Sequence, residues 1–133
     1  MVLFGEGTSS DGNRVLPFRS ALIGAARDAL AEAEHTGRVW IQPLSVTYTR
    51  LLGLPLGRQH RPMIAWYGSM AMPPHLLGVS KRGAIDVVVT WGEPIGFDER
   101  SNRKEIARAL EAEVRRMTIA TLRGNSDGPA AIR

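Results

Sequence analysis

The segment from Ile85 to Trp91 constrains the fold of this chain more than any other stretch of its sequence. It is dominated by β-branched and aromatic residues, which fit the pleated surface of a strand. The turn sequence Gly92-Glu93-Pro94 follows directly and ends the strand, because proline has no amide hydrogen for a sheet ladder. Residues 85–91 are therefore predicted to be a strand.

Two amphipathic helices are predicted, one on each side of this strand in the sequence. Apolar residues recur at helical spacing over residues 18–34, and Gly37 ends that pattern. Asn102 and Glu105 match a capping box, and the apolar face that follows consists of Ile106, Leu110, Val114 and Met117. Since strands and helices alternate, the predicted class is α/β with a mixed sheet flanked by helices.

The remaining segments are predicted from the same patterns. Val2–Phe4 fits the tail of a buried strand, and residues 63–67 fit a further strand. Residues 39–48 are rich in β-forming types, but Pro43 within them marks an edge, a bulge or a strand break. Loops are expected over residues 5–17, 49–62 and 68–78, the last with room for a short irregular helix.

Length and composition set the limits of the fold. A chain of 133 residues favours one domain, assigned to residues 1–123, followed by a disordered tail over residues 124–133. The absence of cysteine excludes a disulfide framework, a thiolate metal site and a cysteine nucleophile, and no metal or cofactor is predicted. No stretch reaches the roughly 18 apolar residues that span a bilayer, so we expect a chain that is soluble or at most surface-bound.

The basic residues are unusual in kind rather than in number. They outnumber the acidic residues by 17 to 13, and all of them except Lys81 and Lys104 are arginines. The planar guanidinium group suits phosphate and carboxylate ligands better than an ammonium group does. An anionic ligand would explain this bias, and a GC-rich genome would explain it equally well.

The block from Leu3 to Gly12 (Leu-Phe-Gly-Glu-Gly-Thr-Ser-Ser-Asp-Gly) carries the clearest chemical signal. The glycines on both sides of Glu6 permit positive φ and let a ligand approach the main chain closely. Backbone amides in such a turn can form a nest for an anion, to which Thr8 and Ser10 would add hydroxyl donors. Glu6 could accept hydrogen bonds from a substrate hydroxyl or orient an arginine. The alternative is a loop before a helix in which Glu6 only caps backbone amides.

Nucleotide-binding loops are excluded. A Walker A loop needs a Gly-Lys pair, which this chain lacks. A dinucleotide fingerprint needs a glycine-like residue where Ser10 stands, and a full strand before the glycines.

Several blocks in order resemble the glycerolipid acyltransferases, the family that includes 1-acyl-sn-glycerol-3-phosphate acyltransferase. Residues 6–12 are similar to the third sequence block of that family, and residues 16–22 to the helix that follows it. Residues 41–46 (Ile-Gln-Pro-Leu-Ser-Val) resemble its fourth block. Residues 83–87 and 91–95 resemble a later strand and its Gly-Glu-Pro ending. The resemblance touches most of residues 3–122 and implies a glycerol-3-phosphate acyltransferase-like fold, incomplete at its N-terminus.

The resemblance implies acyl transfer from an acyl carrier protein or acyl-CoA to the free hydroxyl of a lysophospholipid such as 1-acyl-glycerol-3-phosphate. It assigns Pro43 to a substrate pocket and Arg19 to the phosphate of the acceptor. The residues that it assigns to the acceptor and its phosphate are Glu6, Gly7, Thr8, Ser10 and Arg19.

Two departures from the family pattern concern the acceptor. Gly5 stands where the family has proline, which loosens the turn. Ser9 stands where the family has arginine, which removes one phosphate partner. The acceptor therefore stays open between lysophosphatidate and another lyso-lipid, including an ornithine-lipid precursor.

Acyl transfer to a hydroxyl needs a base, usually a histidine oriented by a carboxylate. The family provides a histidine followed, after four residues, by aspartate. None of His35, His60 and His75 is followed by aspartate at that spacing, so no catalytic residue is assigned. We interpret the chain as a truncated or mis-started acyltransferase, inactive by itself, whose missing part supplies the pair.

Two other interpretations stay open: a catalytically inactive lipid-phosphate-binding or interaction module, and a basic α/β domain for nucleic acid. The second is disfavoured because the aromatic residues fall in strand-like segments, away from the arginine clusters, and offer no stacking platform. These aromatic residues are Trp40, Trp66, Tyr67 and Trp91.

The expected partners are an acyl donor, a lysophospholipid acceptor and the cytoplasmic surface of a membrane, with no nucleic acid. Membrane association follows here from the substrate class and not from any segment that could anchor the chain. The cations expected to face anionic headgroups, or an acidic carrier protein, are Arg50, Arg58, Arg61, Lys81 and Arg82.

Overall fold

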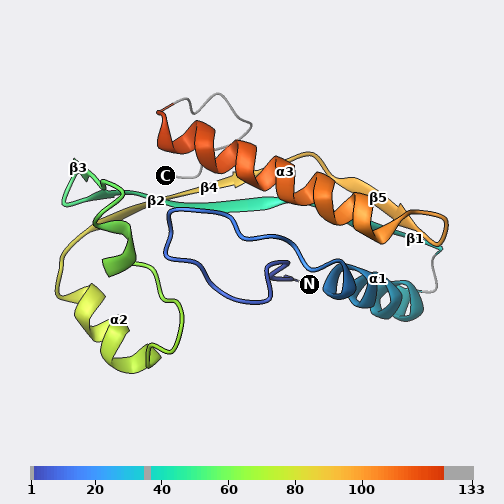
Figure 1. Cartoon of the computed structure of the whole chain (residues 1–133), viewed down its shortest axis with the longest axis horizontal. Helices are drawn as coiled ribbons and strands as arrows, with labels where there is room; N and C mark the ends of the chain where they lie inside the picture. Colours follow the sequence, from blue (N-terminus) through green and yellow to red (C-terminus); the bar gives the residue numbers. More distant parts are fainter. Residues whose placement is uncertain (1, 35–36, 125–133) are drawn as a thin grey trace.

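The computed structural model describes residues 2–34 and 37–124 (Figure 1). The tail predicted to be disordered lies, apart from Gly124, outside the described residues. Within the described part, no helix combines the length and the apolar character needed to cross a membrane. The elements in chain order are α1 (Ser20–Glu34), β1 (Arg38–Ile41), β2 (Leu44–Leu51), β3 (Leu54–Pro55), the 3₁₀ helix η1 (Arg61–Met63), α2 (Met72–Ser80), β4 (Ile85–Trp91), β5 (Ile95–Asp98) and α3 (Arg103–Leu122).

The strands of the described residues form two antiparallel sheets, which corrects the mixed sheet predicted from the sequence. β1 pairs with β5, while β2 lies between β3 and β4. Pro43 stands between β1 and β2 and has no amide hydrogen, so the two strands separate there and take different partners. The α/β class is confirmed, and β4 has the predicted bounds.

Helix α3 lies along β2 and contacts α1 (Figure 1). The side chain of Asn102 accepts a hydrogen bond from the Lys104 amide at 3.0 Å and donates one to Glu105 Oε1 at 3.2 Å, which confirms the predicted cap. Leu110, Val114 and Met117 are buried as predicted, and Ala107 is buried with them. The apolar face of α3 therefore packs against β2 and α1.

The hydrophobic core lies where α1, α3 and β5 meet. Its central side chains are at most 4% exposed and come from α1 (Ile23), β5 (Phe97) and α3 (Ala107 and Leu110). Helix α1 begins at Ser20, two residues after the predicted start, and packs against α3 and β1. The half-buried side chains around this core are Phe18, Ile41, Ile95 and Ile106.

The connection between β2 and β4 contains a hairpin where the sequence predicts a loop. β2 continues to Leu51 and turns through Leu52 (φ 52°) and Gly53 (φ 77°) into β3. Two positive φ angles in a two-residue turn match the twist of antiparallel strands. The usual Asn-Gly signal for this turn is absent, which is why a loop is the expectation from sequence.

The strand predicted over residues 63–67 is wrong. Pro62 favours the first turn of a helix, and the chain forms η1 there before burying Ile64 and Ala65. Trp66 and Tyr67 therefore lie outside the strands, which removes part of the argument against nucleic acid. The short helix allowed over residues 68–78 is α2, whose prolines stand in its first turn, where helix amides have no partner within the helix.

The strand predicted over Val2–Phe4 is also wrong. The chain turns immediately, because the Phe4 carbonyl accepts a hydrogen bond from the Gly7 amide at 3.0 Å. The Phe4 side chain is 79% exposed, so this apolar run is not buried in the described structure.

Candidate functional site

The turn around Glu6 is shaped by its two glycines. Gly7 has a φ of 69°, a conformation that glycine adopts without a steric penalty. A Cβ atom at Gly5 would lie 2.9 Å from the Phe18 ring, so a larger residue at this position would displace that ring. The Gly5 carbonyl also accepts a hydrogen bond from the Arg19 amide at 2.8 Å. Glycine in place of the family's proline therefore fits the packing of this turn.

Arg19 lies against the turn, next to Gly7. A Cβ atom at Gly7 would lie 3.0 Å from both Cδ and Nε of Arg19. Thr8 is exposed, and Ser10 Oγ accepts a hydrogen bond from the Gly12 amide at 3.4 Å. Because the Gly7 amide already bonds within the turn, any anion held here would rely more on Arg19 than on a nest of amides.

Glu6 is half-buried and one of its oxygens, Oε2, is shielded from solvent without a hydrogen-bond partner in the described part of the chain. Burial raises the pKa of Glu6 above its ordinary value, and the nearby carboxylate of Glu111 adds to the rise. A hydrogen bond from the Leu16 backbone and the charge of Arg115 act in the opposite direction. Glu6 is thus a carboxylate with unused acceptor capacity.

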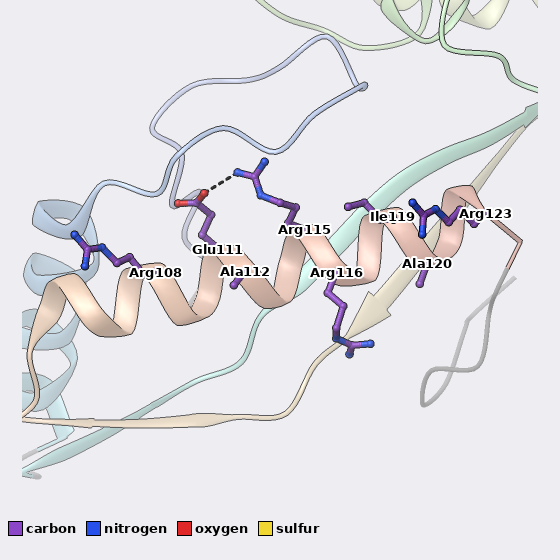
Figure 2. A pocket seen from close by; sticks show the side chains of 8 residues that line it. All are labelled: Arg108, Glu111, Ala112, Arg115, Arg116, Ile119, Ala120 and Arg123. Carbon is purple, nitrogen blue, oxygen red and sulfur yellow. Dashed lines mark hydrogen bonds and ion pairs between the residues drawn. The ribbon is translucent and has the colours of Figure 1, made fainter.

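Two side chains of α3 hold the loop that carries Glu6. Glu111 Oε2 accepts a hydrogen bond from the Phe18 amide at 3.2 Å. Arg115 Nη2 donates to the Val15 carbonyl at 3.2 Å and to Glu111 Oε1 at 2.6 Å. Figure 2 shows this ion pair on the side of α3 that faces the loop. Between the loop and α3, the carboxylates of Glu6 and Glu111 therefore lie near the guanidinium group of Arg115.

An open groove of about 620 Å³ follows a stripe of α3 that has Glu111 and Arg115 at its edge toward the loop, while Arg116 points away from the loop (Figure 2). Sequence reasoning missed it, although Arg108 and Arg115 are seven residues apart and so share one helix face. Guanidinium groups alternate there with small and apolar side chains, a lining that suits an anionic amphiphile. The lining residues are Arg108, Glu111, Ala112, Arg115, Arg116, Ile119, Ala120 and Arg123.

Pro43 lies on another side of α3. Its carbonyl accepts a hydrogen bond from the Gly92 amide at 2.9 Å, and a Cβ atom at Gly92 would meet Pro43 Cγ at 2.8 Å and Glu113 Cγ at 3.1 Å. Glu113 is two residues from Glu111, and side chains two positions apart point to roughly opposite sides of a helix. The structure therefore brings Glu6, Gly7 and Arg19 together but does not bring Pro43 to them.

The described histidines have different surroundings. His60 is exposed, while His75 Nε2 lies 3.1 Å from the Ile64 carbonyl oxygen and can donate to it in the matching tautomer. Neither forms an ion pair with a carboxylate within residues 2–34 and 37–124. We assign no base among the residues that the structure describes.

Proteins named lyso-ornithine lipid O-acyltransferase are similar to this chain over most of its length. The Rhizobium meliloti protein is 46% identical over 130 residues, which are 98% of this chain and 44% of that protein. The Brucella abortus protein is 48% identical over 124 residues, 93% of this chain and 46% of that protein. The Rhodobacter capsulatus protein is 34% identical over 122 residues, 86% and 39% of the two chains.

The chain spans less than half the length of these relatives. No family model matches the chain, and no solved structure matches it. The predicted similarity to lipid acyltransferases is thus confirmed, because these homologues are named as lipid acyltransferases. Membership of the 1-acyl-sn-glycerol-3-phosphate acyltransferase family is not confirmed.

Proposed function

We propose that this chain supplies the acceptor-binding side of an acyl transfer in lipid biosynthesis, from acyl carrier protein or acyl-CoA to a lyso-lipid hydroxyl. In that reaction the hydroxyl loses its proton, an ester bond forms, the thioester carbon–sulfur bond breaks and the thiol leaves with a proton. The single observation that carries the proposal is 46–48% identity to acyltransferases over more than nine-tenths of the chain.

Lyso-ornithine lipid is the acceptor that we propose first, and 1-acyl-glycerol-3-phosphate is the second candidate. An ornithine headgroup carries an ammonium and a carboxylate, whereas a glycerol phosphate carries only negative charge. The shielded Oε2 of Glu6 offers an acceptor for an ammonium, and Arg19 offers a donor for a carboxylate. Ser9 in place of the family's arginine leaves one cation fewer for a phosphate. These features favour the zwitterionic headgroup.

The residues proposed to hold the headgroup are Glu6, Gly7, Thr8, Ser10 and Arg19, with Pro43 proposed for a separate substrate pocket. No residue of this chain is proposed as the base. The protein is proposed to act at the cytoplasmic surface of a membrane, to which it is bound peripherally. Arg115 faces the loop of the headgroup site with its charge offset by Glu111, and Arg108 lies on the same face of α3.

The headgroup assignment is tested by equilibrium dialysis of the 133-residue chain with each labelled lyso-lipid below its micelle concentration. Glu6→Gln should weaken binding of lyso-ornithine lipid about tenfold, since a charged hydrogen bond is lost. Binding of 1-acyl-glycerol-3-phosphate should stay equal or tighten. The matched control is Glu99→Gln, an exposed carboxylate in the turn before α3. Equal losses for both lipids would contradict the headgroup assignment, and no binding of either would contradict the proposal.

A second candidate function is a lipid-phosphate-binding or interaction module without catalysis. The observation in its favour is that neither His60 nor His75 meets a carboxylate in the described residues. The two functions are separated by assaying acyl transfer with the protein purified from its source cells and with the 133-residue chain. We expect turnover from the first and none from the second. Turnover by the chain that depends on either histidine would contradict our assignment of no base.

A further inference from the structure

Residues 50–84, here called the acid-free lobe, contain no aspartate or glutamate. No acidic residue occurs anywhere between Glu34 and Asp86, although the rest of the chain carries acids at ordinary frequency. The lobe nevertheless carries five cations: Arg50, Arg58, Arg61, Lys81 and Arg82. A solvated protein surface normally mixes both signs of charge, so a continuous segment of one sign indicates an anionic partner.

The acid-free lobe also exposes large apolar side chains. They lie on the hairpin tip, after η1 and along α2, which has no buried residue. A helix with this apolar content ordinarily buries one face against the protein. The exposed fractions are 71% for Leu54, 64% for Leu52, 63% for Leu76, 58% for Leu77, 52% for Met72 and 41% for Trp66.

The parts of the lobe are joined to one another. The Leu52 amide donates to the Ala84 carbonyl at 2.8 Å, which fixes the hairpin to the residues after α2. His75 Nε2 lies 3.1 Å from the Ile64 carbonyl oxygen, which fixes α2 to the residues after η1. Figure 1 shows β3 and α2 at the same end of the molecule, away from α1. The cations and the exposed apolar side chains therefore share one end.

From this juxtaposition we propose that the acid-free lobe docks on the surface of an anionic lipid bilayer. Leu52, Leu76 and Leu77 enter the interfacial layer. The exposed cations of the lobe meet lipid phosphates; they are Arg50, Arg58, Lys81 and Arg82. Charge complementarity argues for this occupant, because a bilayer surface offers both a dense negative charge and an adjoining apolar layer. An acidic protein would match the cations and leave the leucines without a partner.

The arginine groove of α3 is the weaker membrane candidate. Arg115 and Arg116 are paired there with Glu111 and Glu113, which offsets their charge. Ile119 is the large apolar side chain exposed on that helix in the described residues. No lobe cation forms an ion pair in the described residues, although Arg50 stands opposite Asp86 on β4 and Arg58 is near Asp11. The lobe also exposes more large apolar side chains than α3 does, so the bilayer is assigned to the lobe.

Docking of the lobe would also place the headgroup site beside the lipid. Arg61 Nη1 donates to Asn13 Oδ1 at 3.1 Å, and Asn13 belongs to the same loop as Glu6. The inference rests on the proposed function only for the choice of a lipid as partner. Vesicle binding requires no acyl transfer, so the two proposals can fail separately.

The test is co-sedimentation of the 133-residue chain with vesicles of phosphatidylcholine alone and of equal parts phosphatidylcholine and phosphatidylglycerol. The chain should bind the anionic vesicles, and added salt should weaken the binding. The double substitution L76Q/L77Q should reduce partitioning by at least about tenfold. The double substitution K81Q/R82Q should reduce it about fivefold for each cation removed.

Matched controls lie outside the lobe and outside the groove of α3: Trp40→Gln on β1 for the leucines, and R103Q/K104Q for the cations. Both should sediment like the parent chain. Far-ultraviolet circular dichroism should show all variants folded, because every substituted side chain is exposed. Equal losses in the controls, equal binding to both vesicle types, or no binding at all would overturn the proposal. A dimer in gel filtration that L76Q/L77Q dissociates would also overturn it, because a second copy would then cover the lobe.

Discussion

The two ends of this molecule use apolar residues in opposite ways. Where α1, β5 and α3 meet, Phe97 and Leu110 are 1% and 2% exposed. In the acid-free lobe, Leu54 and Leu76 are 71% and 63% exposed, although Leu56 beside them is 4% exposed. Apolar content alone therefore does not predict burial. The packed end maintains the fold, whereas the lobe exposes apolar surface in the described structure.

The two ends also differ in whether their cations are paired with acids. Helix α3 pairs its arginines with its own glutamates at positions three and four residues apart. The lobe contains no acid, and none of its cations forms an ion pair in the described part of the chain, although Arg50 stands opposite Asp86 of β4. In the described residues of the lobe, cations without an ion pair lie together with six exposed large apolar side chains, which is why we assign it to a membrane surface.

The largest expected effect contrasts two leucines on helices. Leu110→Ala should lower the free energy of unfolding by about 2–5 kcal/mol, because it leaves a cavity in the core. Leu76→Ala should change it by less than about 0.5 kcal/mol, because that side chain is already exposed. Urea denaturation of both variants measures the difference. Similar losses in both would show that α2 is packed and would remove the contrast between the two ends.

A smaller effect of opposite sign is expected at two glycines. Gly7→Ala should destabilise the chain by about 1–2 kcal/mol, because alanine is unfavourable at positive φ. Gly78→Ala should stabilise it by about 0.5–1 kcal/mol, since Gly78 lies inside α2 with open space around it. Thermal denaturation would show the midpoint falling in the first variant and rising in the second. A fall in both would indicate that α2 is constrained by contacts.

Substitutions at the helix caps should change the stability of the two ends by amounts of about the same size. Asn102 caps α3 with its side chain, whereas Ala71 precedes α2 without a side-chain hydrogen bond. Asn102→Ala should cost about 1 kcal/mol of stability, and Ala71→Ser should add up to about 1 kcal/mol. Chemical denaturation checks both. An unchanged stability in the serine variant would show that α2 does not contribute to the cooperative unit.

The smallest effect concerns how stability depends on pH through Glu6. The loop that carries Glu6 contacts both Glu111 of α3 and Arg61 of the lobe. The folded-state pKa of Glu6 is raised above its ordinary 4.5 by burial, so its stabilising contribution is present below that value and lost as the pH rises through the folded pKa. Glu6→Gln should therefore be more stable than the parent chain near about pH 7, and equally stable near about pH 4. Thermal denaturation at both pH values measures this.

Asp11 supplies the matched control of opposite sign. Hydrogen bonds from Asn13 lower the pKa of Asp11, so its contribution is present above the ordinary aspartate pKa and lost as the pH falls through the folded pKa. Asp11→Asn should therefore be less stable than the parent chain near about pH 7. A destabilised Glu6→Gln variant would contradict the raised pKa of Glu6 and show that the Leu16 hydrogen bond and the charge of Arg115 outweigh burial.

The parts of the fold that follow from local chemistry are the ones that the sequence predicts. The bounds of β4 follow from the Gly-Glu-Pro turn after it, and the start of α3 follows from the Asn102 cap. The hairpin through Leu52 is missed because leucine rarely adopts positive φ. The mixed sheet is mispredicted because strand pairing depends on segments far apart in the chain, which no local pattern reports.

The sequence also predicts only those contacts of the candidate site that are close together along the chain. The contact between Gly7 and Arg19 spans a short stretch of sequence, and the block pattern places both residues in one site. The partners of that loop on α3 are far away: Arg115 is 100 residues from Val15, and Glu111 is 93 residues from Phe18. Only the three-dimensional structure could bring them to Glu6.

Hydrogen–deuterium exchange of the 133-residue chain with and without anionic vesicles measures the difference between the two ends most directly. Vesicles should slow exchange in the β2–β3 hairpin and in α2, where the exposed leucines lie, and leave α3 unchanged. Slowed exchange in α3 with no change in the lobe would contradict the assignment of the membrane surface to the acid-free lobe.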